Sequence, residues 1–231
     1  MHARRQRTGF TLMEIMVALL VFGVGSVAVA SLWPAAIICR ERSVNDGVGS
    51  MICANGLSLL KAHGQAADVP DVLGPIVAED DTDMLEPEEQ NWPVRAEANE
   101  SGMGLAALGQ RLTDAGACRL IVVAYHKREG GQVQWRNVTV QSDAGLRKEI
   151  ELPDGHPVRK GTPVIFRETG RYAYVLRVYD DGGQQTALLN RELDVPNGNK
   201  TAYVLVEVDG GDIASVSPAM RVLSARAELE P

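Results

Sequence analysis

The 231-residue sequence lacks an excess of positive charge. Acidic residues outnumber lysine and arginine by 30 to 23, and the formal net charge is −7. Because contacts with phosphate groups need clustered lysine and arginine, we predict no nucleic-acid partner. The charged fraction of 23% is ordinary, which excludes a disordered or coiled-coil chain. A chain of this length forms one domain, or one domain with an appendage, without covalent staples.

Signatures of catalysis and of metal binding are also scarce. Beyond the first nine residues three histidines remain, and none has a second ligand at helical or turn spacing. The sequence contains neither a G-x-S-x-G motif nor a Walker loop. We therefore predict no enzymatic activity, no catalytic residue, no cofactor and no bound metal.

Three cysteines, Cys39, Cys53 and Cys118, form neither a C-x-x-C pair nor a disulfide framework. Cys53 and Cys118 could form a bridge if the chain beyond residue 40 lies outside the cytoplasm. Buried free thiols are the alternative. The odd count leaves at least one thiol unpaired in either case.

A long uncharged run follows a basic leader at the N-terminus. Residues 1–9 carry three arginines and no acidic residue, whereas residues 15–38 carry no charge. As a helix this run spans about 36 Å, enough for a hydrocarbon core of about 30 Å. The positive-inside rule predicts a cytoplasmic leader and an exported remainder. We predict a transmembrane helix over residues 10–38, which includes Ile15, Val21, Gly23, Trp33, Pro34 and Ile38.

Several kinds of N-terminal segment share this layout. A secretory signal peptide is one, since Ala28-Val29-Ala30 fits a cleavage site before Ser31. A plain single-pass anchor is another. Neither accounts for Glu14, because a carboxylate near the bilayer centre costs about 2.5 kcal/mol or more. Its position predicts a function, with a carboxylate that only extends to the cytoplasmic surface as the alternative.

The residues around Glu14 have a recognisable order. The run Gly9-Phe10-Thr11-Leu12-Met13-Glu14 is followed by a long apolar stretch. It resembles the class III leader junction of type IV pilins and type II secretion pseudopilins. In that family a short basic leader ends in glycine, and the mature chain has phenylalanine first and glutamate fifth. The resemblance covers residues 1–63, and the remainder carries no further match.

The resemblance implies roles for three residues. Gly9 precedes the cut made by a prepilin peptidase, and Phe10 becomes the new, N-methylated N-terminus. Glu14 pairs with the Phe10 amine of a neighbouring subunit during assembly, since two buried charges are tolerable only when paired. The implied partners are the peptidase, other pilin or pseudopilin subunits, the inner-membrane assembly platform and the membrane. The implied location is the bacterial inner membrane, with a cytoplasmic N-terminus and an exported head, and then a filament.

The next two segments connect the transmembrane helix to the head. Apolar residues at helical spacing predict an amphipathic continuation of the helix over residues 39–64. Residues 65–93 are acidic and contain prolines, which predicts a solvated loop. A calcium site at Asp80, Asp81 and Asp83 is the alternative, although the spacing of an EF-hand is absent.

Residues 94–231 are predicted to form a β-rich head. A turn at residues 128–131 predicts a hairpin between strands at 119–127 and 132–141, and a short helix is expected near 103–115. Further strands are predicted at 163–167, 171–179, 186–193, 201–208 and 220–228. The predicted fold is α+β: a long N-terminal helix, with a membrane half and an amphipathic half, packed on a mainly antiparallel β-sheet head.

Two classes of function remain. The first is a minor pilin or pseudopilin that assembles through its N-terminal helix into a type IV pilus or a type II secretion pseudopilus. The large head favours an accessory subunit over a major one. The second is an exported binding or enzymatic domain with a conventional signal peptide or a single-pass anchor.

Overall fold

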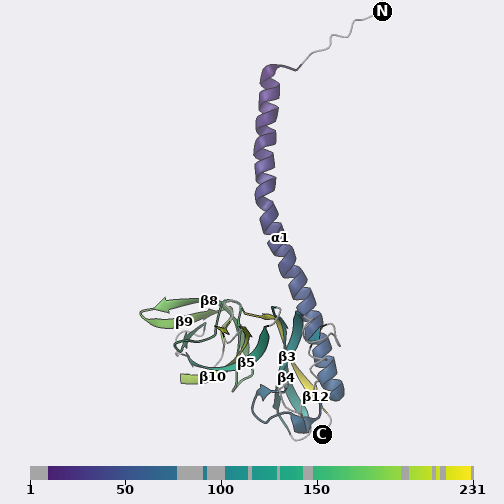
Figure 1. Cartoon of the computed structure of the whole chain (residues 1–231), viewed down its shortest axis with the longest axis vertical. Coiled ribbons are helices and arrows are strands. Elements are labelled where there is room, and N and C mark those ends of the chain that lie inside the picture. Colours follow the sequence, from purple (N-terminus) through teal and green to yellow (C-terminus); the bar gives the residue numbers. More distant parts are fainter. Residues whose placement is uncertain are drawn as a thin grey trace, which may run out of the picture. The chain divides into compact units, whose positions relative to one another are not determined.

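The computed structural model describes residues 10–76, 91–92, 102–113, 116–128, 131–142, 148–193, 198–209, 212–213 and 217–229. The chain divides into two compact units, Met1–Asn45 and Asp46–Pro231. One long α-helix, a five-stranded sheet and a seven-stranded sheet make up most of the described residues (Figure 1). This layout confirms the predicted α+β fold with a mainly antiparallel head.

Helix α1 runs from Leu12 to His63 and contributes to both units. Gly64 follows it, and the Gly64 N–H donates to the Leu60 carbonyl at 2.9 Å. Within the second unit α1 buries Ile52, Cys53 and Leu60, which recur at helical spacing on one face. This part of the helix is therefore amphipathic and forms one wall of the head.

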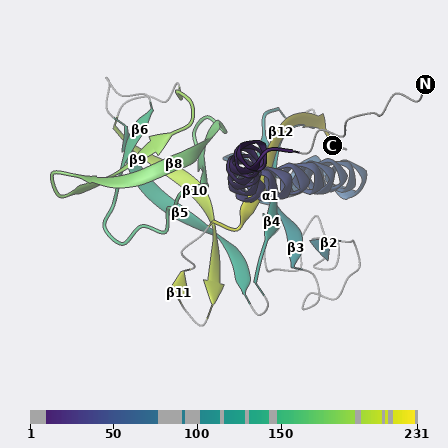
Figure 2. The same cartoon turned by 90° about the horizontal axis from the view of Figure 1, so that it is seen from above.

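The first sheet lies against that face of α1 (Figures 1 and 2). Its strand order is β1-β3-β4-β12, and β2 pairs with β3. The strands are β1 (Gly74–Pro75), β2 (Asn91–Trp92), β3 (Met103–Arg111), β4 (Ala117–His126) and β12 (Ala219–Glu228). Leu105, Leu120 and Val122 are buried in the core that the sheet shares with the helix.

The second sheet closes on itself as a small barrel. Its strand order is β11-β10-β5-β6-β9-β8-β7. Strand β7 also pairs with β10, and this pairing closes the sheet. The strands are β5 (Gln132–Ser142), β6 (Glu149–Leu152), β7 (Pro163–Phe166), β8 (Tyr172–Asp181), β9 (Gln184–Leu189), β10 (Gly198–Asp209) and β11 (Asp212–Ile213). Val164 and Phe166 belong to one core cluster and Ile165 to another, as the alternation of side chains along a strand requires.

A third apolar cluster joins the barrel to the first sheet. Ile165, Tyr203 and Leu205 on the outside of the barrel pack in one cluster with Leu108 and Ile121 of the first sheet. The first sheet is consequently covered on both faces, by α1 on one side and by the barrel on the other.

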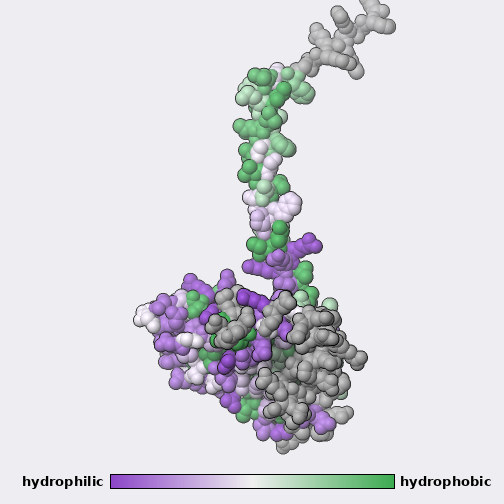
Figure 3. Space-filling model, in the orientation of Figure 1, coloured by the Kyte–Doolittle hydropathy of each residue, from purple (hydrophilic) through white to green (hydrophobic). Residues whose placement is uncertain are grey.

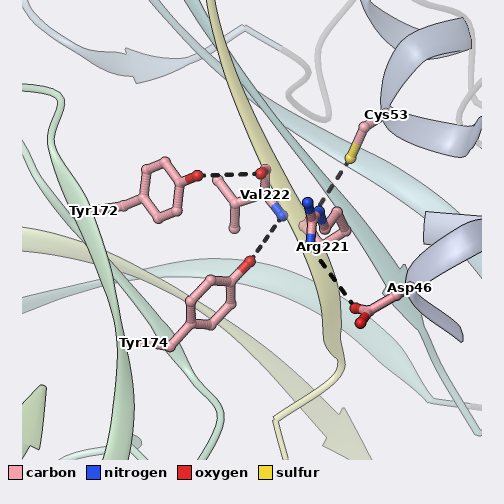
Figure 4. A network of polar contacts seen from close by, with 6 residues as sticks. All are labelled: Asp46, Cys53, Tyr172, Tyr174, Arg221 and Val222. Atoms are coloured by element: carbon pink, nitrogen blue, oxygen red, sulfur yellow. Dashed lines mark hydrogen bonds and ion pairs between the residues drawn. The ribbon is translucent and has the colours of Figure 1, made fainter. Parts of the chain in front are cut away.

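Two tyrosines of β8 hold the outer edge of β12 (Figure 4). The Val222 N–H donates to the Tyr174 hydroxyl at 2.9 Å, and the Tyr172 hydroxyl donates to the Val222 carbonyl at 3.3 Å. Burial, with the neighbouring Tyr172, raises the pKa of Tyr174 to about 12, so this hydroxyl keeps its proton. The pair satisfies backbone groups that an edge strand otherwise leaves unpaired.

The helix predicted near residues 103–115 is wrong, because residues 103–111 form strand β3. Leu105, Ala107 and Leu108 are all buried, since the two faces of this strand contact different cores. A strand buried on both faces loses the apolar–polar alternation that marks a strand in a sequence.

The hairpin predicted between residues 119–127 and 132–141 is also wrong. Strand β4 belongs to the first sheet and β5 to the barrel, so the turn carries the chain from one sheet to the other. Glu207 of β10 stabilises this turn, because its carboxylate accepts a hydrogen bond from the Arg128 N–H. The carboxylate also fills the space where a side chain at Gly131 would lie.

The described part of the predicted acidic loop is packed onto the head. Ala66–Asp68 forms a 3-10 turn, and Val69, Leu73 and Ile76 are buried. These apolar residues lie between the prolines and acidic residues that led to the prediction of a solvated loop. The calcium candidates Asp80, Asp81 and Asp83 lie outside the described residues.

Candidate assembly site at the start of α1

Thr11 and Glu14 close the first turn of α1. The Thr11 N–H and hydroxyl donate to Oε2 of Glu14 at 2.8 and 2.9 Å, and the Glu14 N–H donates to the Thr11 hydroxyl at 3.3 Å. This reciprocal arrangement is a capping box, which satisfies N–H groups that the first turn leaves unpaired. Sequence reasoning missed Thr11, although its T-x-x-E spacing signals such a box.

The capping box leaves the Glu14 carboxylate open to a second partner. Both contacts with Thr11 end on Oε2, and within the described residues Oε1 accepts no hydrogen bond. Glu14 is exposed, and Phe10 is 86% exposed at the same end of the helix. Gly9 lies outside the described residues. A cation from another molecule can therefore reach the carboxylate while the helix start remains capped.

Apolar side chains cover the N-terminal part of α1 (Figure 3). From Phe10 to Ile38 its large hydrophobic side chains are between 47% and 86% exposed. The helix continues through Pro34. Within the described residues it is the one helix long and apolar enough to cross a membrane. The six residues predicted for the membrane all lie on it: Ile15, Val21, Gly23, Trp33, Pro34 and Ile38.

Cys53 and Cys118 are free cysteines, so the structure contains no bridge between them. Both are buried in the core between α1 and the first sheet. The Cys53 thiol lies 3.6 Å from the carbonyl oxygen of Arg221 (Figure 4). It lies at the same distance from the carbonyl oxygen of Val122. Burial raises the pKa of Cys53 to about 11 and also raises that of Cys118. The two thiols stay protonated and pack as small apolar side chains.

Cysteine labelling distinguishes free thiols from a bridge. In the mature chain in a non-ionic detergent, iodoacetamide is expected to modify the exposed Cys39 and to spare the buried Cys53 and Cys118. After unfolding in urea without reductant, all three should react, as mass spectrometry of the adducts will show. If only Cys39 reacts in the unfolded chain, Cys53 and Cys118 are bridged.

Within the described residues no group of three or more His, Cys, Asp or Glu side chains could hold a metal ion. The polar chemistry at the start of α1 thus consists of one carboxylate and its cap. Such an arrangement can bind a cation.

Residues 4–30 match the model of the prokaryotic N-terminal methylation motif. This motif is the class III prepilin leader of type IV pilins and pseudopilins, as the resemblance in the sequence implies. Comparison with curated proteins gives no match, and comparison with solved structures gives none. The matched motif and the long apolar helix support a type IV pilin-like or pseudopilin-like precursor that is anchored in a membrane.

Proposed function

We propose that the protein is a minor pilin or minor pseudopilin that assembles through α1 into a type IV pilus or a type II secretion pseudopilus. The observation that carries the proposal is the position of Glu14. It is the charged residue at the start of an exposed apolar helix, and it lies within the matched motif at residues 4–30. No catalytic activity of the protein's own is part of this function.

Three steps follow from this assignment. A prepilin peptidase cuts after Gly9 on the cytoplasmic side, and the new Phe10 amine is methylated. The three arginines of the leader support a cytoplasmic N-terminus and an exported head. Glu14 then pairs with the Phe10 amine of a neighbouring subunit, while apolar helices of other subunits replace the lipid around α1.

The head supports an accessory role. The second unit extends from Asp46 to Pro231 and contains two sheets in addition to the end of α1. In this proposal the head contacts other exported subunits, and α1 supplies the part that every subunit of the filament shares. The peptidase, the other subunits and the inner-membrane assembly platform are the partners.

The mature N-terminus tests this proposal. In cells with a prepilin peptidase, mass spectrometry should find a chain that begins at N-methylated Phe10. Gly9→Val should leave the leader attached in nearly all molecules, because the peptidase needs a bare backbone at the cut. Thr8→Val, one position earlier, is the control and should be cut normally. A chain that begins at Ser31, or an uncut wild-type leader, contradicts the proposal and favours an exported domain with a conventional signal or anchor.

A further inference from the structure

The head contains a pocket of about 620 Å³. Its lining residues all lie between positions 156 and 185 of the sequence, far from the leader. Five lining residues come from the segment between β6 and β7, and two come from the β8–β9 hairpin: His156, Val158, Arg159, Lys160 and Gly161, with Val178 and Gln185. The half-buried Val178 provides apolar surface, and the fully buried Val158 anchors the segment in the barrel core. The volume falls within the range that small ligands occupy in proteins.

Positive charge lines this pocket in a chain of net charge −7. Arg159 and Lys160 are cations, His156 can become one, and no carboxylate is among the lining residues. Cations on a surface segment are ordinarily solvated and need no ligand. Here the cations lie beside the apolar surface of Val178 in the same pocket. An anion that bears an apolar group can therefore make both kinds of contact, which water cannot.

The segment that bears these charges is held in place by its own hydrogen bonds. Nη1 of Arg159 donates to the carbonyls of His156 and Val158 at 3.1 and 2.9 Å. The Gly161 N–H donates to the Val175 carbonyl at 2.8 Å, and its φ of 86° favours glycine there. Within the described residues Nε and Nη2 of Arg159 make no hydrogen bond. The guanidinium is therefore fixed in position and still has donors to offer.

His156 adds an unsatisfied group to the pocket lining. It is only 9% exposed, and its Nδ1 has no hydrogen-bond partner in the described part of the chain. Burial and then Arg159 lower the pKa of His156, against smaller opposing effects of the Val158 carbonyl and Asp154. An anion in the pocket would favour the imidazolium and raise this pKa.

We propose that the pocket binds a carboxylate borne on a short apolar group. The Arg159 fork and Lys160 pair with the carboxylate, and Val178 contacts the apolar part. The apolar surface of Val178 favours such a ligand over a small, strongly hydrated anion. A free organic acid and the C-terminus of a protein segment both present this chemistry. The proposal concerns the head alone and does not depend on the function proposed for α1.

Titration of the mature chain in a non-ionic detergent tests the pocket. With ¹⁵N-labelled histidine, NMR follows His156 during addition of N-acetyl-leucine or of a pentapeptide that ends in leucine. The C-terminal amides of both probes are the controls. The acids should bind and raise the pKa of His156, and the amides should do neither. Lys160→Gln should weaken binding about fivefold, a modest change because this lysine is exposed. Lys148→Gln removes the same charge from another exposed position of the head and should leave affinity unchanged.

The two probes also separate the sources of the carboxylate. Tighter binding of the peptide supports a protein segment as the ligand, and equal binding of both acids supports a small organic acid. Either result supports the pocket. The proposal is overturned if neither acid binds up to about 10 mM. It is equally overturned if Lys148→Gln weakens binding as much as Lys160→Gln, because the attraction then comes from overall charge.

Discussion

Glu14→Gln is expected to reduce incorporation of the protein into filaments about 100-fold or more, because a buried charge that loses its partner costs several kcal/mol. In the proposed pairing the affected charge is the Phe10 amine of the neighbouring subunit, which would remain cationic in an apolar environment. The head should stay folded, since Glu14 belongs to the first unit, Met1–Asn45. The variant should also be cut after Gly9, so the loss arises at assembly.

The capping box makes glutamine the informative replacement. A glutamine at this position can still accept the hydrogen bond from the Thr11 N–H, so Glu14→Gln removes the charge and keeps the cap. Thr11→Ala does the reverse: it costs about 1 kcal/mol of helix stability and leaves the carboxylate in place. Thr11→Ala should therefore reduce incorporation less than about tenfold. Glu14→Ala removes both interactions and should behave like Glu14→Gln.

Incorporation is measured as the ratio of subunit in sheared filaments to subunit in the membrane fraction, by quantitative mass spectrometry. The same digests report the N-terminus, which shows whether each variant was processed. If Glu14→Gln enters filaments like the wild type and Thr11→Ala does not, the carboxylate serves only the helix start. The charge pairing proposed here is then wrong.

The start of α1 could be predicted from the sequence because its determinants are local. The leader, the junction at Gly9–Phe10 and the uncharged run lie within a few consecutive turns of chain. The capping box is equally local, and its T-x-x-E spacing at Thr11 and Glu14 is visible in the sequence. In the proposed assembly the same carboxylate caps the helix through Oε2 and offers Oε1 to the neighbouring amine, so one side chain has both roles.

Strand partners in the head could not be predicted in the same way. Strands β8 and β9 form a hairpin across Gly182 and Gly183, where both glycines have positive φ and mark the turn. The turn between β4 and β5 has a similar signature, yet these strands belong to different sheets. Strand β4 is buried on both faces, and contacts with α1 and with the barrel decide its position. Such contacts join residues far apart in sequence and leave no local pattern.

Gly56→Leu is expected to destabilise the unit Asp46–Pro231 by about 3 kcal/mol, the upper part of the range for an overpacked core. A Cβ added at Gly56 would lie 2.7 Å from Cδ2 of Leu105 and 3.3 Å from Cγ1 of Val122. Both neighbours are buried between α1 and the first sheet. The further carbons of leucine can be accommodated only if the helix moves away from β3 and β4.

Gly47 provides the matched control on the same helix. A Cβ added there has no atom within 4 Å, and the position is exposed. Gly47→Ala should stabilise the head by up to about 1 kcal/mol, because alanine favours the helix more than glycine does. Gly56→Ala gains the same helix propensity and meets only the flexible end of Leu105 first, so its effect should fall between the other two.

Thermal unfolding of the mature chains in a non-ionic detergent, followed by near-ultraviolet circular dichroism, ranks the three variants. If Gly56→Leu unfolds at the wild-type temperature, α1 does not pack on the first sheet through this face. Residues 46–63 complete the core of the head and continue directly from the helix proposed for assembly. Gly56→Leu should therefore reduce both the folded head and the filament signal, whereas Glu14→Gln reduces the filament signal alone. This difference separates folding of the head from assembly of the filament.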